Sequence, residues 1–136
     1  MNREARPVTL GQVLISIVIP AFNEAKYLPV SLEAAHRSRA VLGQAGWTSE
    51  VIVCDNNSTD ETAAVARANG ARVVFEPFNQ IAASRNAAGL AARGDWLVFV
   101  DADTQVTPKL FREMMRAMVR DDCLGGGCPG KFDSGP

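Results

Sequence analysis

Short apolar segments alternate along the chain with segments whose apolar residues recur at helical spacing. The apolar segments are rich in β-branched residues, and they predict strands at residues 14–20, 50–55, 71–77 and 95–101. The helical patterns fall at residues 28–42, 58–69, 80–93 and 107–120. Continuous apolar runs are typical of strands buried on both faces, and strands that alternate with helices form parallel sheets. We therefore predict an α/β fold, with a mostly parallel sheet and helices on both faces.

Local signals mark where two of these helices begin. Ser58 and Glu61 fit a capping box, in which each side chain bonds the other residue's backbone N–H. Thr107 and Pro108 fit an N-cap followed by proline at the first helical position. The apolar strand that ends at Asp101 is expected to run through the middle of the covered sheet.

Composition and charge narrow the class of protein. With 136 residues, 47% of them hydrophobic, the chain is long enough for one domain with its own core. The net charge is −1 and no basic stripe is present, so nucleic-acid binding is not expected. The longest apolar run, residues 13–22, is too short to span a bilayer and does not fit a signal peptide. We expect residues 1–12 to be a flexible extension, residues 13–136 to be one domain, and the protein to be cytoplasmic.

The three cysteines do not form a recognisable metal set. Cys54 lies within an apolar strand pattern, whereas Cys123 and Cys128 flank a glycine run with a spacing that suits no common zinc pair. His36 is the only histidine in the sequence. Reduced thiols are therefore the expected state.

Polar or acidic side chains follow every predicted strand. The segments are PAFNE at 20–24, DNNSTD at 55–60, EPFNQ at 76–80 and DADT at 101–104. Because parallel strands deliver their carboxyl ends to one edge of the sheet, where ligands bind, these segments outline a candidate site. Carboxylates crowded on one edge repel each other unless a cation or hydrogen-bond donors lie between them.

Asp101 and Asp103 are the candidate metal ligands. In an extended segment, residues two apart project to the same side, so both carboxylates could face one ligand. Two carboxylates suit Mg²⁺ or Mn²⁺, and Ala102 between them would leave room for a ligand to approach. The alternative interpretation is an ordinary turn before the next helix, since aspartate is a common turn residue.

Three other polar residues allow a functional and a structural interpretation. Asp55, directly at a strand end, could accept a hydrogen bond from a nucleobase N–H or a ribose hydroxyl. Asn23 could instead be a helix cap, and Glu24 could be an acid in the first helical turn.

Arg85 could bring a guanidinium towards phosphates or could lie on a solvated helix face. The aromatic residues near the strand ends, Phe22, Phe75 and Phe78, are expected to be packing residues rather than residues that stack on bases.

Taken together, four segments resemble the donor-binding half of a family 2 glycosyltransferase of the GT-A fold. They are SIVIPAFNE at 16–24, VIVCDNNSTDET at 51–62, SRNAAG at 84–89 and GDWLVFVDADT at 94–104. They occur in the order and spacing of that family and cover about residues 14–120. The resemblance implies a Rossmann-like GT-A fold, truncated here, with residues 13–136 as a nucleotide-sugar-binding half-domain.

The resemblance also implies roles for individual residues. The nucleotide of the donor would be held by Pro20, Ala21, Phe22, Glu24 and Asp55, with Arg85, Asp101 and Ala102 also close to the donor. The D-x-D motif of the family binds a divalent cation on the donor's diphosphate, which here implies Mg²⁺ or Mn²⁺ on Asp101 and Asp103, with Asp103 as the direct ligand.

Two departures from the family bear on activity. Asp55-Asn56-Asn57-Ser58 stands where the family usually has D-D-G-S, and no candidate is found for the general base, which the family carries in its acceptor-binding half. The predicted function is metal-assisted, inverting transfer of a sugar from a UDP- or GDP-linked donor to an unknown acceptor, with a lipid-linked acceptor at the inner membrane face as one candidate. The alternative is a catalytically silent nucleotide-binding or assembly domain, with a homodimer as one form. An oxidoreductase would need G-x-G-x-x-G after the first strand, which is absent.

Overall fold

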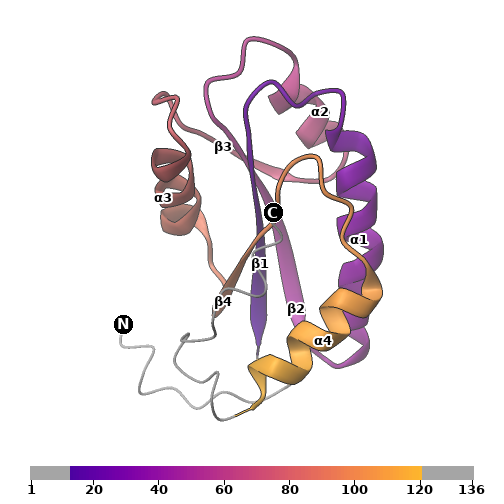
Figure 1. The fold of residues 1–136 in the computed structure, drawn as a ribbon. Helices are drawn as coiled ribbons and strands as arrows, with labels where there is room; N and C mark the ends of the chain where they lie inside the picture. Colours follow the sequence, from indigo (N-terminus) through magenta and orange to yellow (C-terminus); the bar gives the residue numbers. More distant parts are fainter. Residues whose placement is uncertain (1–12, 121–136) are drawn as a thin grey trace.

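The computed structural model describes residues 13–120 of the chain. Strands and helices alternate along it (Figure 1): β1 (Leu14–Ala21), α1 (Leu28–Gln44), β2 (Thr48–Asp55), α2 (Thr62–Ala68), β3 (Arg72–Phe75), α3 (Ile81–Ala91), β4 (Trp96–Phe99) and α4 (Pro108–Met118). The expected N-terminal extension and the segment that contains Cys123 and Cys128 lie outside the described residues.

The four strands form one parallel sheet in the order β3-β2-β1-β4. Figure 1 shows α3 on one face of the sheet and α1, α2 and α4 on the other. The predicted α/β architecture is therefore confirmed. The prediction that the fourth strand runs through the middle is wrong for residues 13–120, because β4 pairs there with β1 alone and β1 is central.

Alternating residues of the central strands supply the two sides of the core. Ile15, Ile17 and Ile19 of β1 are fully buried against α1 and α4, in the larger hydrophobic cluster. Val18 lies on the opposite face with Cys54, where both pack beneath α3. Burial on both faces explains why this strand reads as a continuous apolar run.

Two helix starts differ in how well the sequence predicted them. The Thr107 side chain accepts a hydrogen bond from Leu110 N at 3.1 Å, so the predicted N-cap of α4 is confirmed. The capping box at Ser58 is wrong, because α2 begins only at Thr62 and its N-cap residue makes no side-chain cap bond. Asp60 instead accepts a hydrogen bond from Thr62 N at 2.9 Å.

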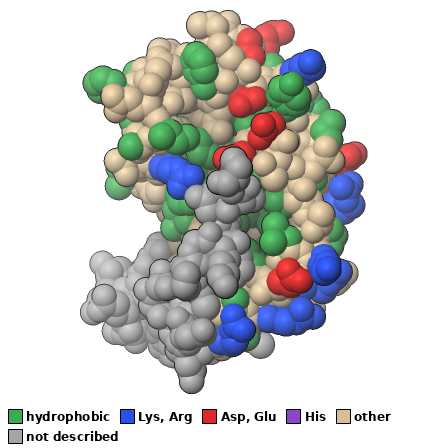
Figure 2. All heavy atoms as spheres, in the orientation of Figure 1, with side chains coloured by type: hydrophobic (Ala, Val, Ile, Leu, Met, Phe, Trp, Pro, Cys, Tyr) green, Lys and Arg blue, Asp and Glu red, His purple; other side chains and the backbone are tan. Residues whose placement is uncertain are grey.

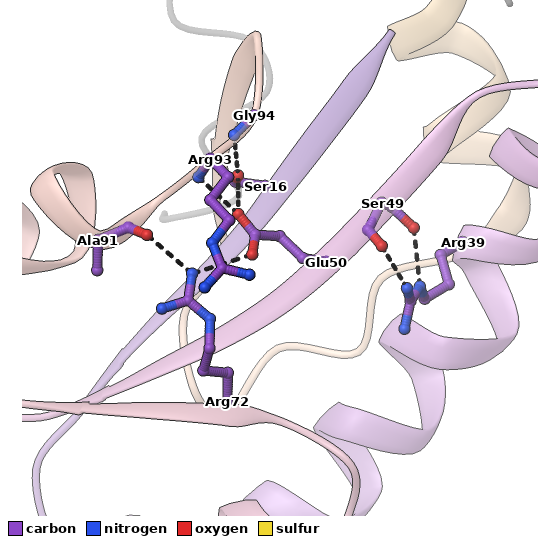
Figure 3. A network of polar contacts seen from close by, with 8 residues as sticks. All are labelled: Ser16, Arg39, Ser49, Glu50, Arg72, Ala91, Arg93 and Gly94. Atoms are coloured by element: carbon purple, nitrogen blue, oxygen red, sulfur yellow. Dashed lines mark hydrogen bonds and ion pairs between the residues drawn. The ribbon is translucent and has the colours of Figure 1, made fainter. Parts of the chain in front are cut away.

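A polar cluster centred on Glu50 joins the amino ends of the strands (Figure 3). The Glu50 carboxylate accepts hydrogen bonds from Ser16 Oγ, from Arg93 N and from Arg72 Nη2, at 2.6, 2.7 and 3.0 Å. Burial alone would raise the pKa of Glu50, but these bonds outweigh it and hold the pKa below its usual value. The cluster therefore fixes the connection between α3 and β4 against β1 and β2.

Gly94 in that connection lies too close to β1 for any side chain. A Cβ atom there would lie 2.5 Å from Ser16 Oγ, 2.7 Å from Ser16 N and 2.9 Å from Leu14 O. Gly94 N also donates to Ser16 Oγ at 2.8 Å. Position 94, two residues before β4, must therefore be glycine for β4 to approach β1 in this register.

None of the helices between residues 13 and 120 is long and apolar enough to cross a membrane.

Candidate functional site

The strand order creates a switch point beside β1. The chain runs outward from β1 through β2 to β3, and then returns to place β4 on the other side of β1. Ligands of open α/β sheets bind beyond the carboxyl ends of the strands at such a point. The segments that lie there are residues 22–27 after β1 and residues 100–107 after β4.

Asn23 joins the loop after β1 to the loop after β2. Its Oδ1 accepts hydrogen bonds from Thr59 N at 2.8 Å and from Asp60 N at 3.2 Å, and its own N–H donates to Ser58 Oγ at 2.9 Å. The N-cap of α1 is Tyr27, which has no side-chain cap bond. The helix-cap interpretation of Asn23 is therefore wrong, and its amide instead orders the neighbouring loop.

Asn56 joins the loop after β2 to the loop after β3. Its Nδ2 donates to Glu76 O at 3.2 Å and also to Phe78 O, while its own carbonyl accepts from Asn79 Nδ2 at 2.8 Å. Its N–H donates to Ala21 O at the end of β1. An aspartate has no donor to offer two carbonyls when ionised. This accounts for asparagine at position 56, where the family that the sequence resembles usually has the second aspartate of D-D-G-S.

Asn57 occupies a left-handed backbone conformation, with φ at 61°. Glycine is the usual residue there in D-D-G-S, and asparagine is among the few other residues that adopt such φ values readily. Its Nδ2 donates to Asn79 Oδ1 at 3.2 Å. Side-chain amides therefore connect residues 22–27, 56–61 and 76–80 into what we term the three-loop rim.

The predicted nucleotide-binding residues of β1 and β2 lie at the base of this rim. Pro20 and Ala21 are the last two residues of β1, and Ala21 pairs in register with Asp55 of β2. Asp55 is 7% exposed, and its Oδ1 accepts a hydrogen bond from Ser58 N at 3.0 Å. That bond fixes the orientation of a carboxylate that the sheet itself holds at the strand end.

Glu24 lies within electrostatic reach of three other carboxylates. Burial raises its pKa, and the negative charges of Asp103, Asp60 and Asp101 raise it further. Its N–H donates to Thr62 Oγ1 at 3.0 Å, which ties the loop to the start of α2. Figure 2 shows acidic side chains gathered in the upper part of the molecule, on the side that faces the viewer. The structure therefore brings together acids from three separate loops, as the strand order predicts.

The two candidate metal ligands lie in a turn, which we call the acidic turn (residues 101–104). Thr104 N donates to Asp101 O at 3.0 Å, and β4 already ends at Phe99, so the extended geometry assumed from the sequence is wrong. Ala102 is buried in the larger core, and its carbonyl accepts from Ser31 Oγ of α1 at 2.6 Å. The Ala102 side chain therefore fills part of the core and does not leave open space for a ligand. Ala102 anchors the turn, while the two aspartates beside it reach solvent.

The carboxylates can be tested against the needs of a divalent cation. Within residues 13–120, no three histidine, cysteine or acidic side chains lie close enough together to hold a metal ion. Mg²⁺ sites often use only one or two carboxylates, with substrate phosphates and waters in the other positions. Asp101 and Asp103 fit a cation of that kind. Burial and the charges of these two aspartates disfavour the ionised form of Glu24, and a cation would relieve the repulsion.

Arg85 lies on α3, with its guanidinium carbon 4.8 Å from the centroid of the Phe99 ring. Phe99 is the last residue of β4 and comes two residues before Asp101. The predicted phosphate-binding side chain is therefore held beside the strand that leads into the acidic turn. The sequence pattern did not point to Phe99, because only the pairing of β4 with β1 shows which side of the sheet its ring covers.

The three phenylalanines of the strand ends are exposed. Phe22, Phe75 and Phe78 are 49%, 58% and 67% accessible to solvent, so none of them is a core residue and the expected packing role is not seen for about half or more of each side chain. Phe22 and Phe78 belong to the three-loop rim. Their exposure leaves aromatic surface next to the loops that are predicted to hold a nucleoside.

The fold described above matches part of the GT-A glycosyltransferases. Glucosyl-3-phosphoglycerate synthase from Mycobacterium tuberculosis, solved with Mn²⁺, uridine diphosphate and glucosyl-3-phosphoglycerate, is similar with a TM-score of 0.64 and 26% identity. Mannosyl-3-phosphoglycerate synthase from Rubrobacter xylanophilus is similar with a TM-score of 0.60 and 26% identity. The matches cover 78% and 72% of this chain, but only 39% and 33% of those enzymes.

The sequence belongs to glycosyl transferase family 2, whose family model matches residues 16–135. An uncharacterized glycosyltransferase of Mycobacterium tuberculosis is 36% identical over 104 residues, which is 74% of this chain and 43% of that protein. A second uncharacterized glycosyltransferase, from Rickettsia prowazekii, is 34% identical over 82 residues, or 60% of this chain and 28% of that protein. The chain therefore spans less than half the length of these relatives.

Proposed function

We propose that this chain binds the donor of a metal-dependent glycosyltransferase, which takes a sugar from a UDP- or GDP-linked nucleotide-diphosphate sugar. The observation that carries the proposal is the convergence of Glu24, Asp101 and Asp103 at the switch point of the sheet. The M. tuberculosis enzyme of similar fold was solved with Mn²⁺ and uridine diphosphate, which supports both the metal and the class of donor.

Each part of the site has a separate proposed task. Asp103, helped by Asp101, holds Mg²⁺ or Mn²⁺, and the chemistry that such a cation supplies is neutralisation of the charge on the leaving diphosphate. Asp55 accepts a hydrogen bond from a nucleobase N–H or a ribose hydroxyl, while residues 20–24 contact the nucleoside. Arg85 donates to a phosphate, for which a planar guanidinium is well suited.

Inverting transfer also requires a general base that takes the proton from the acceptor hydroxyl. Among residues 13–120 we assign that role to none, so donor binding is the part of the reaction proposed for them. The acceptor, including a lipid-linked one, stays a prediction. So do the homodimer, the extent of the domain over residues 13–136, and a cytoplasmic location or one at the inner membrane face.

Titration calorimetry with UDP and GDP, in Mn²⁺, in Mg²⁺ and in EDTA, tests the proposal. We expect one of the two nucleotides to bind more tightly with metal. Asp103→Asn, which removes only the charge, should weaken metal-dependent binding by about tenfold or more, because a carboxylate ligand to the cation is lost. Glu113→Gln, an exposed carboxylate on α4, is the matched control and should bind like the wild type. Absence of binding to both nucleotides, or equal metal-dependent affinity in Asp103→Asn, overturns the proposal.

Turnover is measured separately, by release of the nucleoside diphosphate from UDP- and GDP-linked sugars. Sugar transfer or donor hydrolysis would show that the general base is available to this chain. Binding without turnover would instead support the alternative, a catalytically silent nucleotide-binding domain.

A further inference from the structure

We propose that Phe99 is a positioning residue, which holds the Arg85 guanidinium in place for the diphosphate of the donor. The inference rests on the proposed function, and it concerns a residue that has no polar atom in its side chain. If so, β4 positions two groups that would meet the diphosphate. Its last residue holds the Arg85 guanidinium, and the same strand leads into the acidic turn that is proposed to hold the cation.

The geometry of the pair supports a fixed guanidinium. The carbon of the Arg85 guanidinium lies over the Phe99 ring, 4.8 Å from its centroid, within the range in which a cation is attracted to the face of an aromatic ring. The ring is itself packed against the smaller core cluster, which includes Val18 and Cys54. An arginine side chain has many rotamers, and contact with a ring that is itself packed against the core reduces the number that it populates.

The backbone connects this ring closely to the acidic turn. Phe99 pairs in register with Val18, and Val100 N donates to Val18 O at 2.9 Å. Ala102 is then anchored by the bond from Ser31 Oγ to its carbonyl. Phe99 and the turn are therefore held by the sheet and by α1 as one unit, so a guanidinium placed on the ring is also placed relative to Asp101.

The contact with Phe99 is compatible with phosphate binding. Cation–π attraction uses the face of the guanidinium, whereas hydrogen bonds to phosphate oxygens use the N–H groups in its plane. A cation on the acidic turn and a guanidinium on α3 would then approach the diphosphate from two different elements. Loss of the ring should leave the positive charge present but less well oriented.

A double-mutant cycle separates this role from a purely structural one. The variants are Phe99→Leu, Phe99→Tyr, Arg85→Gln and the combination of Phe99→Leu with Arg85→Gln. The dissociation constants of UDP and of uridine are measured by calorimetry in Mn²⁺. Uridine is the internal control because it lacks the diphosphate, and urea unfolding verifies that each variant is folded. Phe99→Met, whose side chain fills irregular space, replaces Phe99→Leu if the latter does not fold.

We expect Phe99→Leu to weaken UDP binding by about threefold to tenfold, as for the loss of a cation–π contact, and to leave uridine binding unchanged. Phe99→Tyr keeps the ring and should restore the affinity for UDP. In the Arg85→Gln background, Phe99→Leu should have no further effect. Equal weakening of UDP and uridine, or an undiminished effect without Arg85, overturns the inference while the donor-binding proposal stands. Failure of the wild type to bind UDP overturns both for a uridine donor, and GDP with guanosine then replaces the pair of ligands.

Discussion

Replacement of Glu50 by glutamine tests the polar cluster at the amino ends of the strands. Glu50 Oε2 accepts from Ser16 Oγ and Arg93 N, Oε1 accepts from Arg72 Nη2, and only 17% of the Glu50 side chain is exposed. Glutamine has nearly the same shape, but it carries an NH₂ group where one oxygen was. In either orientation that group faces a donor, and the charge opposite Arg72 is lost.

The expected magnitude follows from the bonds that glutamine can keep. Its oxygen can replace Oε2, so the bonds from Ser16 and Arg93 N survive as neutral ones, while the bond from Arg72 is lost. Hydrogen bonds to charged groups contribute about 1.5–3 kcal/mol each, roughly twice as much as neutral ones. Glu50→Gln should therefore lower the free energy of unfolding by about 2–3 kcal/mol. Glu33→Gln is the matched control. The Glu33 side chain is 75% exposed and its Oε1 lies 3.7 Å from Arg37 Nη1, so this substitution should lower the free energy of unfolding by less than about 0.5 kcal/mol.

Urea unfolding followed by the fluorescence of Trp47 and Trp96 measures both variants, at neutral pH and in acid. The folded pKa of Glu50 is lower than its usual value, so the stability that its charge contributes is present above the usual pKa. That contribution is lost as the pH falls through the folded pKa. The gap between the wild type and Glu50→Gln should therefore be constant near neutral pH and close in acid. A loss no greater than that of Glu33→Gln, or a gap that acid does not change, would refute the role assigned to the charge.

Two further substitutions test other contacts. Asn56→Asp turns a carboxylate towards two backbone carbonyls of the loop after β3. It should lower the free energy of unfolding in urea by about 1–3 kcal/mol at neutral pH, and by less in acid, where a protonated carboxyl regains a donor. Unchanged stability would contradict the contact. Gly94→Ala places a Cβ atom 2.5 Å from Ser16 Oγ and should cost about 2 kcal/mol or more in thermal unfolding. Gly43→Ala, in α1 with no atom within 4 Å of the new Cβ, should instead be neutral or stabilising by up to about 1 kcal/mol, and equal losses in both glycine variants would rule out the steric explanation.

The type and sequence of the elements could be predicted, because burial on both faces leaves continuous apolar runs and amphipathic helices leave a 3.6-residue period. The order of the strands could not, because the apolar run of β4 would look the same at an edge or at the centre of the sheet. The start of α2 was also missed. Serine is a common N-cap residue, but the Ser58 hydroxyl accepts a hydrogen bond from Asn23 N in another loop. Such a competing partner can be seen only once the order of the strands is known.

The candidate site could be predicted at the level of which loops converge. Parallel strands must deliver Glu24, Asp55 and Asp101 to one edge. The pKa of Glu24, which burial raises and nearby charges including Asp101 raise further, agrees with this for Glu24 and Asp101. The connections within the rim could not be predicted, since the amides of Asn56 and Asn23 bind segments 20 and 36 residues away. Their partners depend on loop geometry rather than on any local pattern.

The distance in sequence between β1 and β4 has a consequence for the order of folding. Leu14 N donates to Asp95 Oδ2 across 81 residues, whereas β1 and β2 pair across a single helical connection. Contacts of long sequence separation form late, because the entropy of closing the larger loop must first be overcome. In pulsed hydrogen exchange, the amide of Val100 should gain protection after those of β2, and simultaneous protection would contradict this order. The loops after β1 and β2 would then become ordered before the acidic turn, so the residues proposed for the nucleoside and those proposed for the cation would come together in separate folding steps.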